Sequence, residues 1–198
     1  MNLHASNLAC ERNGRTVFSN LSFNIASGQC AELRGANGAG KSSLLRLIAG
    51  LVPPASGTVA FDDHTNIAQH LHFIAHQDAM KSSMTVEENL RFWCAVLGGE
   101  NIAPALAAFN LEALEKDPVQ LLSAGQRRRL TLSRLFLAKR PLWLLDEPMT
   151  ALDVTTQVVL REHIRSHLKT GGMVLTATHG DWGVTPDQTI TLGEFAHG

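Results

Sequence analysis

The most constraining stretch of this sequence is the glycine-rich run from Gly35 to Ser42, which reads G-x-x-x-x-G-K-S. A strand-like run over 30–34 precedes it, and residues 43–50 follow at helical spacing and close on a glycine. Strand, glycine loop and helix in this order are typical of a phosphate-binding loop, because the glycines let several backbone N–H groups point at one anion. The positive end of the helix dipole adds to that attraction.

The residues of this loop predict specific roles around a bound phosphate chain. Lys41 is expected to place its charge on the outer phosphates, and the Ser42 hydroxyl is expected to ligate Mg²⁺. The residues predicted to surround the phosphates are Gly35, Ala36, Asn37, Gly38, Ala39, Gly40, Lys41, Ser42 and Ser43.

The bulk properties of the chain bound its class. It has 198 residues, 44% of them hydrophobic, which suits one globular domain. Its net charge of −1 gives no reason to expect a nucleic-acid partner. The opening residues carry no signal peptide pattern, and no apolar run approaches the roughly 20 residues that span a bilayer. The three cysteines, Cys10, Cys30 and Cys94, are expected to be reduced thiols packed as small hydrophobic groups.

Alternating and continuous apolar runs predict an α/β fold. The expected strands are 3–10, 16–25, 30–34, 58–61, 71–75, 142–145, 173–178 and 188–192. The early runs alternate, as in an antiparallel sheet, whereas 142–145 is apolar throughout, as in a parallel strand buried on both faces. We expect one domain over 1–198: a P-loop core with a mostly parallel sheet, an N-terminal antiparallel β subdomain and a helical subdomain inserted at about 78–139.

Two acidic residues end the buried strand 142–145. Asp146 falls at the edge where open parallel sheets bind ligands, and its carboxylate can hold Mg²⁺. Glu147 is placed to orient and deprotonate a water molecule aimed at the terminal phosphate.

A second informative stretch reads Leu-Ser-Ala-Gly-Gln-Arg-Arg-Arg from Leu122. Ser123 is expected to cap a helix, while Gly125 weakens the first turn by about 1 kcal/mol relative to alanine. Three arginines there oppose the helix dipole. Either an anion docks on this helix end or the turn is basic and solvated, and the spacing leaves both interpretations open.

These stretches together resemble ABC-type ATPases over nearly the whole chain. The matching residues, in the family's order, are Gly35 to Ser42, Gln77, Leu122 to Gln126, Leu142 to Glu147, Thr150 to Asp153 and His179. The resemblance implies ATP and Mg²⁺ as cofactors. It implies a homodimer in which Ser123, Gly125 and Gln126 of one subunit meet the γ-phosphate held by the other.

The same resemblance assigns three roles that spacing alone does not reveal. It gives Gln77 the sensing of the Mg²⁺–phosphate site and signalling to a partner. Asp153 becomes a dimer contact, and His179 contacts the γ-phosphate and the attacking water.

A narrower resemblance is to the ATP-binding subunits of the cytochrome c maturation system, the CcmA or haem exporter family. It rests on the short chain, Cys10 to Arg12, Arg15-Thr16, Leu122 to Leu130 and Leu142 to Asp153. It implies a peripheral protein on the cytoplasmic face of a bacterial inner membrane, docked on an integral subunit resembling CcmB. ATP turnover would then drive haem handling or release of a haem-loaded chaperone. The alternatives are another small ABC importer or exporter, or a soluble ABC ATPase acting on DNA or ribosomes.

One departure from the family concerns the adenine. ABC-type ATPases commonly stack it on a tyrosine near the position of Arg12, and this chain has no tyrosine. We predict that Arg12, whose guanidinium can stack on a ring, or nearby Phe18 takes that place.

Two further groups leave alternatives open. His64, His70, His72 and His76 fall close together, and a polar, partly exposed strand is expected there rather than a metal or haem site. Met80, Met84 and Phe92 either line a groove for a partner helix or belong to the core.

Overall fold

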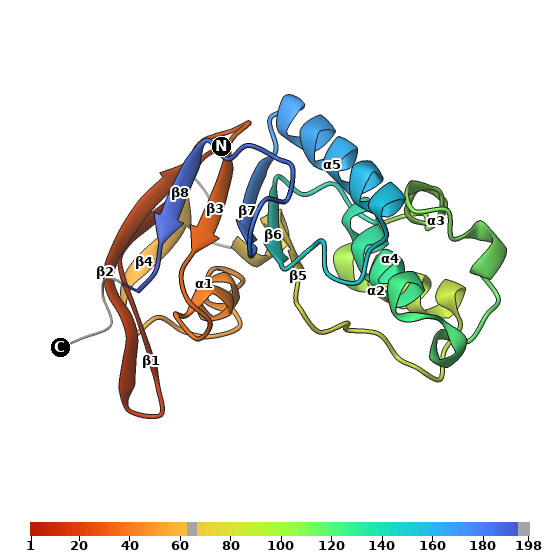
Figure 1. Cartoon of the computed structure of the whole chain (residues 1–198), viewed down its shortest axis with the longest axis horizontal. Coiled ribbons are helices and arrows are strands. Elements are labelled where there is room, and N and C mark those ends of the chain that lie inside the picture. The colour runs from red at the N-terminus through yellow and green to blue at the C-terminus, as the bar shows by residue number, and fades with distance from the viewer. Residues whose placement is uncertain (63–66, 194–198) are drawn as a thin grey trace.

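A computed structural model describes residues 1–62 and 67–193, which form two sheets and a group of helices (Figure 1). The antiparallel sheet has the order β2-β1-β4, with β1 at Leu3–Arg12, β2 at Arg15–Ile25 and β4 at Ser56–Phe61. The parallel sheet has the order β5-β6-β7-β3-β8, with β5 at Leu71–Ile74, β6 at Leu142–Asp146, β7 at Met173–Ala177, β3 at Cys30–Arg34 and β8 at Gln188–Thr191. The predicted α/β fold class, with its parallel and antiparallel sheets, is confirmed.

The described residues form five α-helices. They are α1 at Lys41–Ile48, α2 at Val86–Leu97, α3 at Ala103–Ala108, α4 at Ala124–Ser133 and α5 at Val154–Lys169. Short 3₁₀ turns lie at Ile67–His70, Glu112–Leu114, Val119–Leu121 and Arg134–Phe136. Helical spacing after Ser123 predicts Leu132, Leu135 and Phe136 on one helix, but Leu135 and Phe136 lie in the 3₁₀ turn that follows α4.

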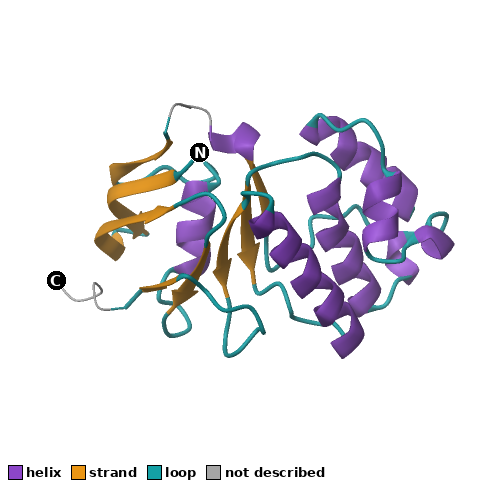
Figure 2. Cartoon of the chain, turned by 90° about the horizontal axis from the view of Figure 1, so that it is seen from above, coloured by secondary structure: helices purple, strands orange, loops and turns teal. Residues whose placement is uncertain are grey.

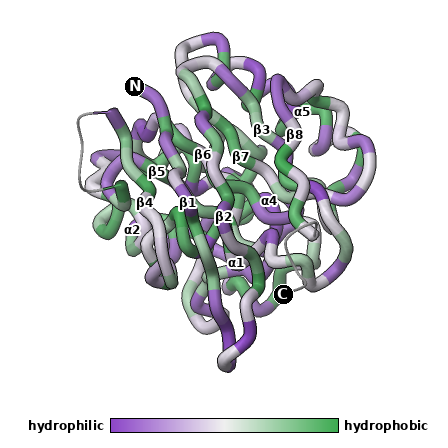
Figure 3. The backbone as a smooth tube through the Cα atoms, turned by 90° about the vertical axis from the view of Figure 1, so that its left-hand side faces the viewer, coloured by the Kyte–Doolittle hydropathy of each residue, from purple (hydrophilic) through white to green (hydrophobic). Residues whose placement is uncertain are grey.

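The parallel sheet is buried on both faces because its central strands are apolar at successive positions. On β6, Leu142 and Leu144 pack into the core shared with α1 and the antiparallel sheet, whereas Trp143 and Leu145 pack among the helices on the other side. Figure 3 shows hydrophobic residues along β6 and β7 in the middle of the molecule. The continuous apolar run therefore marks a central strand, as predicted.

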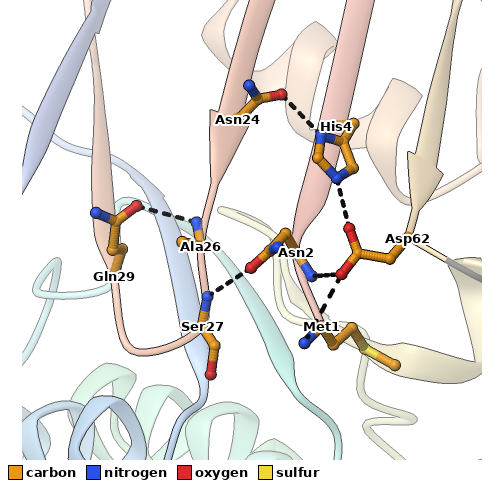
Figure 4. Close-up of polar contacts among 8 residues, drawn as sticks. All are labelled: Met1, Asn2, His4, Asn24, Ala26, Ser27, Gln29 and Asp62. Carbon is orange, nitrogen blue, oxygen red and sulfur yellow. Dashed lines mark hydrogen bonds and ion pairs between the residues drawn. The ribbon is translucent and has the colours of Figure 1, made fainter.

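A polar cluster fastens the N-terminal end of the antiparallel sheet (Figure 4). The Asp62 carboxylate, just after β4, accepts hydrogen bonds from the Asn2 backbone at 2.9 Å and pairs with His4 Nε2 at 2.6 Å. This pairing raises the pKa of His4 and lowers that of Asp62. His4 Nδ1 lies 3.0 Å from Asn24 Oδ1, and the Ser27 N–H donates to Asn2 Oδ1. The cluster thereby holds the turn that leads into β3 and the phosphate loop.

The helices between β5 and β6 gather on one side of the parallel sheet (Figure 2). The sequence Thr85-Val86-Glu87-Glu88 predicts a capping box, and helix α2 begins with it: Thr85 and Glu88 exchange side-chain and backbone hydrogen bonds. The subdomain boundaries of about 78–139 remain a prediction. Among the described residues, no helix is long and apolar enough to cross a membrane.

All three cysteines are buried and free, as their packing role predicts. Burial raises the pKa of the Cys30 thiol to about 12, which keeps it protonated and unreactive.

Candidate functional site

The phosphate loop is closed on itself by its lysine. Lys41 Nζ donates to the carbonyl oxygens of Gly35 at 2.7 Å and Ala36 at 3.1 Å, and the Lys41 side chain is nearly buried. Gly35 has φ +149° and Gly38 has φ +86°, both in the region that favours glycine. These contacts hold the loop in its closed shape, and the ammonium lies where it can reach an anion seated on the loop.

A cavity of about 460 Å³ opens above this loop and gathers most of the predicted site residues. It is lined by Arg12, Val17, Asn37, Gly38, Gly40, Lys41, Ser42, Ser43, Arg46, His76, Gln77, Asp146, Glu147 and His179. These residues come from the end of β1 and the start of β2, the loop and first turns of α1, the end of β6, and the segments that follow β5, β6 and β7. The site therefore lies at the carboxyl ends of parallel strands, where such sheets bind ligands.

Asp146 provides an observation that tests whether Mg²⁺ fits here. Its side chain is 3% exposed, and Oδ2 is buried with no hydrogen-bond partner. A buried polar atom without a partner is uncommon and calls for an explanation. Together with the Ser42 hydroxyl in the same cavity, this carboxylate supplies the hard oxygen ligands that Mg²⁺ takes, so the residues present fit the ion.

Glu147 sits in a constrained backbone conformation next to His179. Its φ is +50°, which is unusual for a residue other than glycine and occurs often at functional sites. Its N–H donates to the Ala177 carbonyl at 2.8 Å, and its carbonyl accepts from Arg128 at 2.7 Å. Glu147 Oε1 lies 3.4 Å from His179 Nε2. These contacts aim a carboxylate and an imidazole at the same end of the cavity.

Some of the predicted residues do not line this cavity. Ala36 and Ala39 belong to the loop, and Gly35 faces a neighbouring cavity of about 720 Å³ that shares His179 with the first. Ser123, Gly125, Gln126 and Asp153 lie elsewhere in the same chain.

The Ser123 stretch forms a capping box at the start of α4. Ser123 Oγ accepts from the Gln126 N–H at 3.2 Å, and Gln126 Oε1 accepts from the Ser123 N–H at 2.7 Å. A β carbon on Gly125 would lie 3.2 Å from the Ala151 carbonyl oxygen, so this glycine allows a close approach within the chain. Asp153 caps α5 by accepting the Thr156 N–H, which lowers the pKa of its carboxyl.

The three arginines after Gln126 each donate to backbone carbonyls of this chain, although Arg127 and Arg129 stay partly exposed. A docked anion at this helix end and a basic, solvated turn both stay predictions. Arg127 donates to Leu122 and Arg129 to Phe109, and Arg128 is buried against three carbonyls. The contacts of Arg128 and Arg129 join residues 18 to 53 positions apart, so no local sequence pattern predicts them.

Of the two residues predicted to stack on the adenine, Arg12 and Phe18, only Arg12 lines the cavity. Phe18 is fully buried in the core and does not line the cavity, so it is not available to a base. Arg12 is exposed and lines the cavity beside Val17.

Arg46 also lines the cavity, and the sequence patterns above did not single it out. Its position four residues after Ser42 on a helix places both side chains on one face, which is the signal that could have identified it.

In the part of the chain that the structure describes, the histidines of the β5 region belong to no group of three or more metal-ligating side chains. His72 is buried, not partly exposed as expected, and its Nε2 lies 2.7 Å from the Ala138 carbonyl. Desolvation lowers the pKa of His72 to about 4. His76 lines the nucleotide cavity, and His64 lies outside the described residues.

Comparisons with known proteins agree with this geometry. Residues 18–150 match the ABC transporter family. The chain is 46% identical to the cytochrome c biogenesis ATP-binding export protein CcmA of Rhodopseudomonas palustris, over 93% of this chain and 95% of that protein. It is likewise 46% identical to the CcmA of Bradyrhizobium diazoefficiens, over 93% and 94%.

Two solved structures share the fold. An ATP-binding subunit of an ABC transporter superposes with a TM-score of 0.89 at 24% identity, over 97% of this chain and 86% of that one. A putative ABC transporter ATP-binding protein from Pyrococcus furiosus gives 0.85 at 22% identity, over the whole of both chains. The chain belongs to the ABC transporter ATP-binding family and, within it, to the CcmA family of cytochrome c biogenesis ATP-binding export proteins.

Proposed function

We propose that this chain is the ATP-hydrolysing subunit of a membrane complex for c-type cytochrome biogenesis, and that it hydrolyses ATP in the 460 Å³ cavity. The carrying observation is that Lys41, Ser42, Gln77, Glu147 and His179, which come from four separate segments, line one cavity together with the unpartnered Asp146.

The roles follow from the chemistry of each side chain. Lys41 and the N–H groups of the loop hold the phosphate chain. Asp146 and Ser42 would hold Mg²⁺, which when bound neutralises charge on the phosphate oxygens. Glu147 accepts a proton from the attacking water. His179, whose Nε2 lies 3.4 Å from the Glu147 carboxylate, contacts the γ-phosphate and the attacking water. Arg12 offers its guanidinium to the base.

The cavity is open, and one copy leaves it incomplete. Ser123, Gly125, Gln126 and Asp153 do not line it. In the proposed homodimer, these residues of one subunit close over the phosphates held by the other. The N-terminal end of α4 suits that contact, since the positive end of a helix dipole attracts anions.

The membrane partner is proposed to be an integral subunit resembling CcmB, with this chain peripheral on the cytoplasmic face of the inner membrane. Helix α2 presents Phe92 and Val96, four residues apart and 37% and 57% exposed. Met80 and Met84 are partly buried, and Met80 packs against the hydrophobic core on this side of the sheet. The α2 residue Trp93 donates to the Ala79 carbonyl at 2.9 Å, two residues beyond Gln77. A partner that moves α2 would therefore move the Gln77 segment.

Co-purification tests the partner. The tagged full chain is expected to retain a CcmB-type subunit through mild detergent extraction of membranes. Val96→Glu should abolish retention, whereas Leu51→Glu, at a 65% exposed residue just after α1, should not. Retention that is equal in both variants would refute the α2 docking surface, and absence of any CcmB-type subunit with the wild-type chain would refute the assignment.

A further inference from the structure

Arg128 is a buried cation beside the catalytic segment that plays no part in the roles assigned so far. It lies on α4 and is 4% exposed. Its Nη2 donates to the carbonyl oxygens of Asp146 at 3.1 Å and Glu147 at 2.7 Å, and its Nη1 donates to that of Ala75 at 3.0 Å. One guanidinium thus joins the end of β6 to the end of β5, and it does not line the nucleotide cavity.

The same guanidinium also reaches beyond Gln77. Nη1 lies 3.8 Å from Asp78 Oδ1, and that oxygen accepts the Thr131 hydroxyl at 2.7 Å. Arg128 and Thr131 are three residues apart on α4, so they face the same way. Helix α4 therefore holds the chain on both sides of Gln77, at Ala75 and at Asp78.

Folding stability alone does not explain a buried guanidinium at this position. Arg128 Nε is buried without a partner, and burial lowers the pKa of the guanidinium. Well-packed apolar residues often stabilise a protein as much as a buried charge or more, whereas fixed hydrogen bonds impose one geometry. The geometry imposed here is that of the Glu147 peptide, whose φ of +50° persists only if its surroundings hold it.

We propose that Arg128 is a positioning residue for ATP hydrolysis: it fixes the Glu147 peptide and links it to the segment that carries Gln77. The inference rests on the proposed role of Glu147. Arg128 supplies the hold on the Glu147 carbonyl, while Ala177 holds the N–H. A displacement of the Gln77 segment by a docked partner passes through the same guanidinium to the catalytic carboxylate.

Steady-state kinetics and nucleotide binding on the full chain test this role. Arg128→Met is expected to lower kcat about 10- to 100-fold, the effect of a misplaced catalytic group, while KM for ATP changes less than about twofold. Arg128→Lys should recover part of kcat, because an ammonium reaches some of the carbonyls but does not bridge all of them. The matched control is Arg140→Met, which removes a guanidinium that also joins two carbonyls, those of Ala68 and Leu97, away from the cavity.

A double variant separates this inference from the proposed function. If Arg128 acts through Glu147, adding Arg128→Met to Glu147→Gln should lower the residual rate little further. Independent, multiplicative losses, or equal losses of kcat and ATP affinity, would overturn the positioning role. If Arg128→Met does not fold, Arg128→Lys decides, since a wild-type kcat in that variant would also overturn it. Near wild-type turnover by Glu147→Gln alone would instead refute the proposed base.

Discussion

Replacing Gly35 by alanine should cost far more stability than the same change at Gly38, although both glycines belong to the phosphate loop. A β carbon on Gly35 would lie 2.3 Å from the Leu192 carbonyl oxygen and 3.0 Å from the Ala39 β carbon. At Gly38, nothing lies within 4 Å of the added atom. Both positions have positive φ, so both alanine variants bear the cost of an unfavourable backbone conformation. The difference between the two variants therefore measures the steric clash at Gly35.

The expected magnitudes follow from these contacts. Left-handed backbone costs a non-glycine residue about 1–2 kcal/mol at either position. The unfolded chain of an alanine variant is less flexible, which returns about 0.4–1 kcal/mol. At Gly35, the backbone just after β8 must also move, and overpacking of this kind costs about 1–3 kcal/mol more. We therefore expect the free energy of unfolding to fall by about 1 kcal/mol for Gly38→Ala and about 3 kcal/mol for Gly35→Ala.

Urea unfolding of the full chain without nucleotide measures both values. The dependence of unfolding free energy on denaturant should stay unchanged, so that the midpoints report stability. Equal losses in the two variants would show that Leu192 does not press on the loop, and would refute the geometry on which the estimate rests.

Three further outcomes are expected. Stability should fall as pH drops from 6.5 towards 4, because the unfolded chain binds a proton that buried His72 excludes while its folded pKa is about 4. When the free energy of unfolding from urea titrations is plotted against pH over this range, His72→Gln should show a shallower slope than the wild-type chain. An unchanged slope would contradict the low pKa assigned to His72. Ser123→Ala should lose about 1 kcal/mol through its cap, whereas Ser123→Thr should lose less. Arg12→Ala should weaken ATP binding in equilibrium dialysis, and an unchanged Kd would exclude Arg12 from the adenine site.

The features that the sequence predicted well are local ones. The glycine loop, the caps at Thr85 and Ser123, and the buried strand before Asp146 each depend on neighbours within a few residues. Local hydrogen bonding and side-chain periodicity determine these elements, so their signals are visible without the fold.

The errors arose where the backbone or the tertiary packing breaks a local pattern. Leu21 and Ile25 of β2 are buried. Side chains of a regular strand alternate between its two faces, so Phe18, at an even-numbered position, would point away from the core. Asn20, with φ +54°, interrupts the strand and returns Phe18 to the core, which leaves Val17 at the cavity. The partners of Arg128 lie up to 53 residues away, so only the folded chain brings them together.

The central claim is that one chain carries half of each ATP site, and ATP-driven dimerisation tests it most directly. Glu147→Gln with Mg²⁺ and ATP should sediment at twice the 21.5 kDa chain mass, because the nucleotide binds but is not hydrolysed. Lys41→Ala, or Ser123→Arg added to Glu147→Gln, should remain monomeric. A Glu147→Gln chain that binds ATP and stays at 21.5 kDa would contradict the claim.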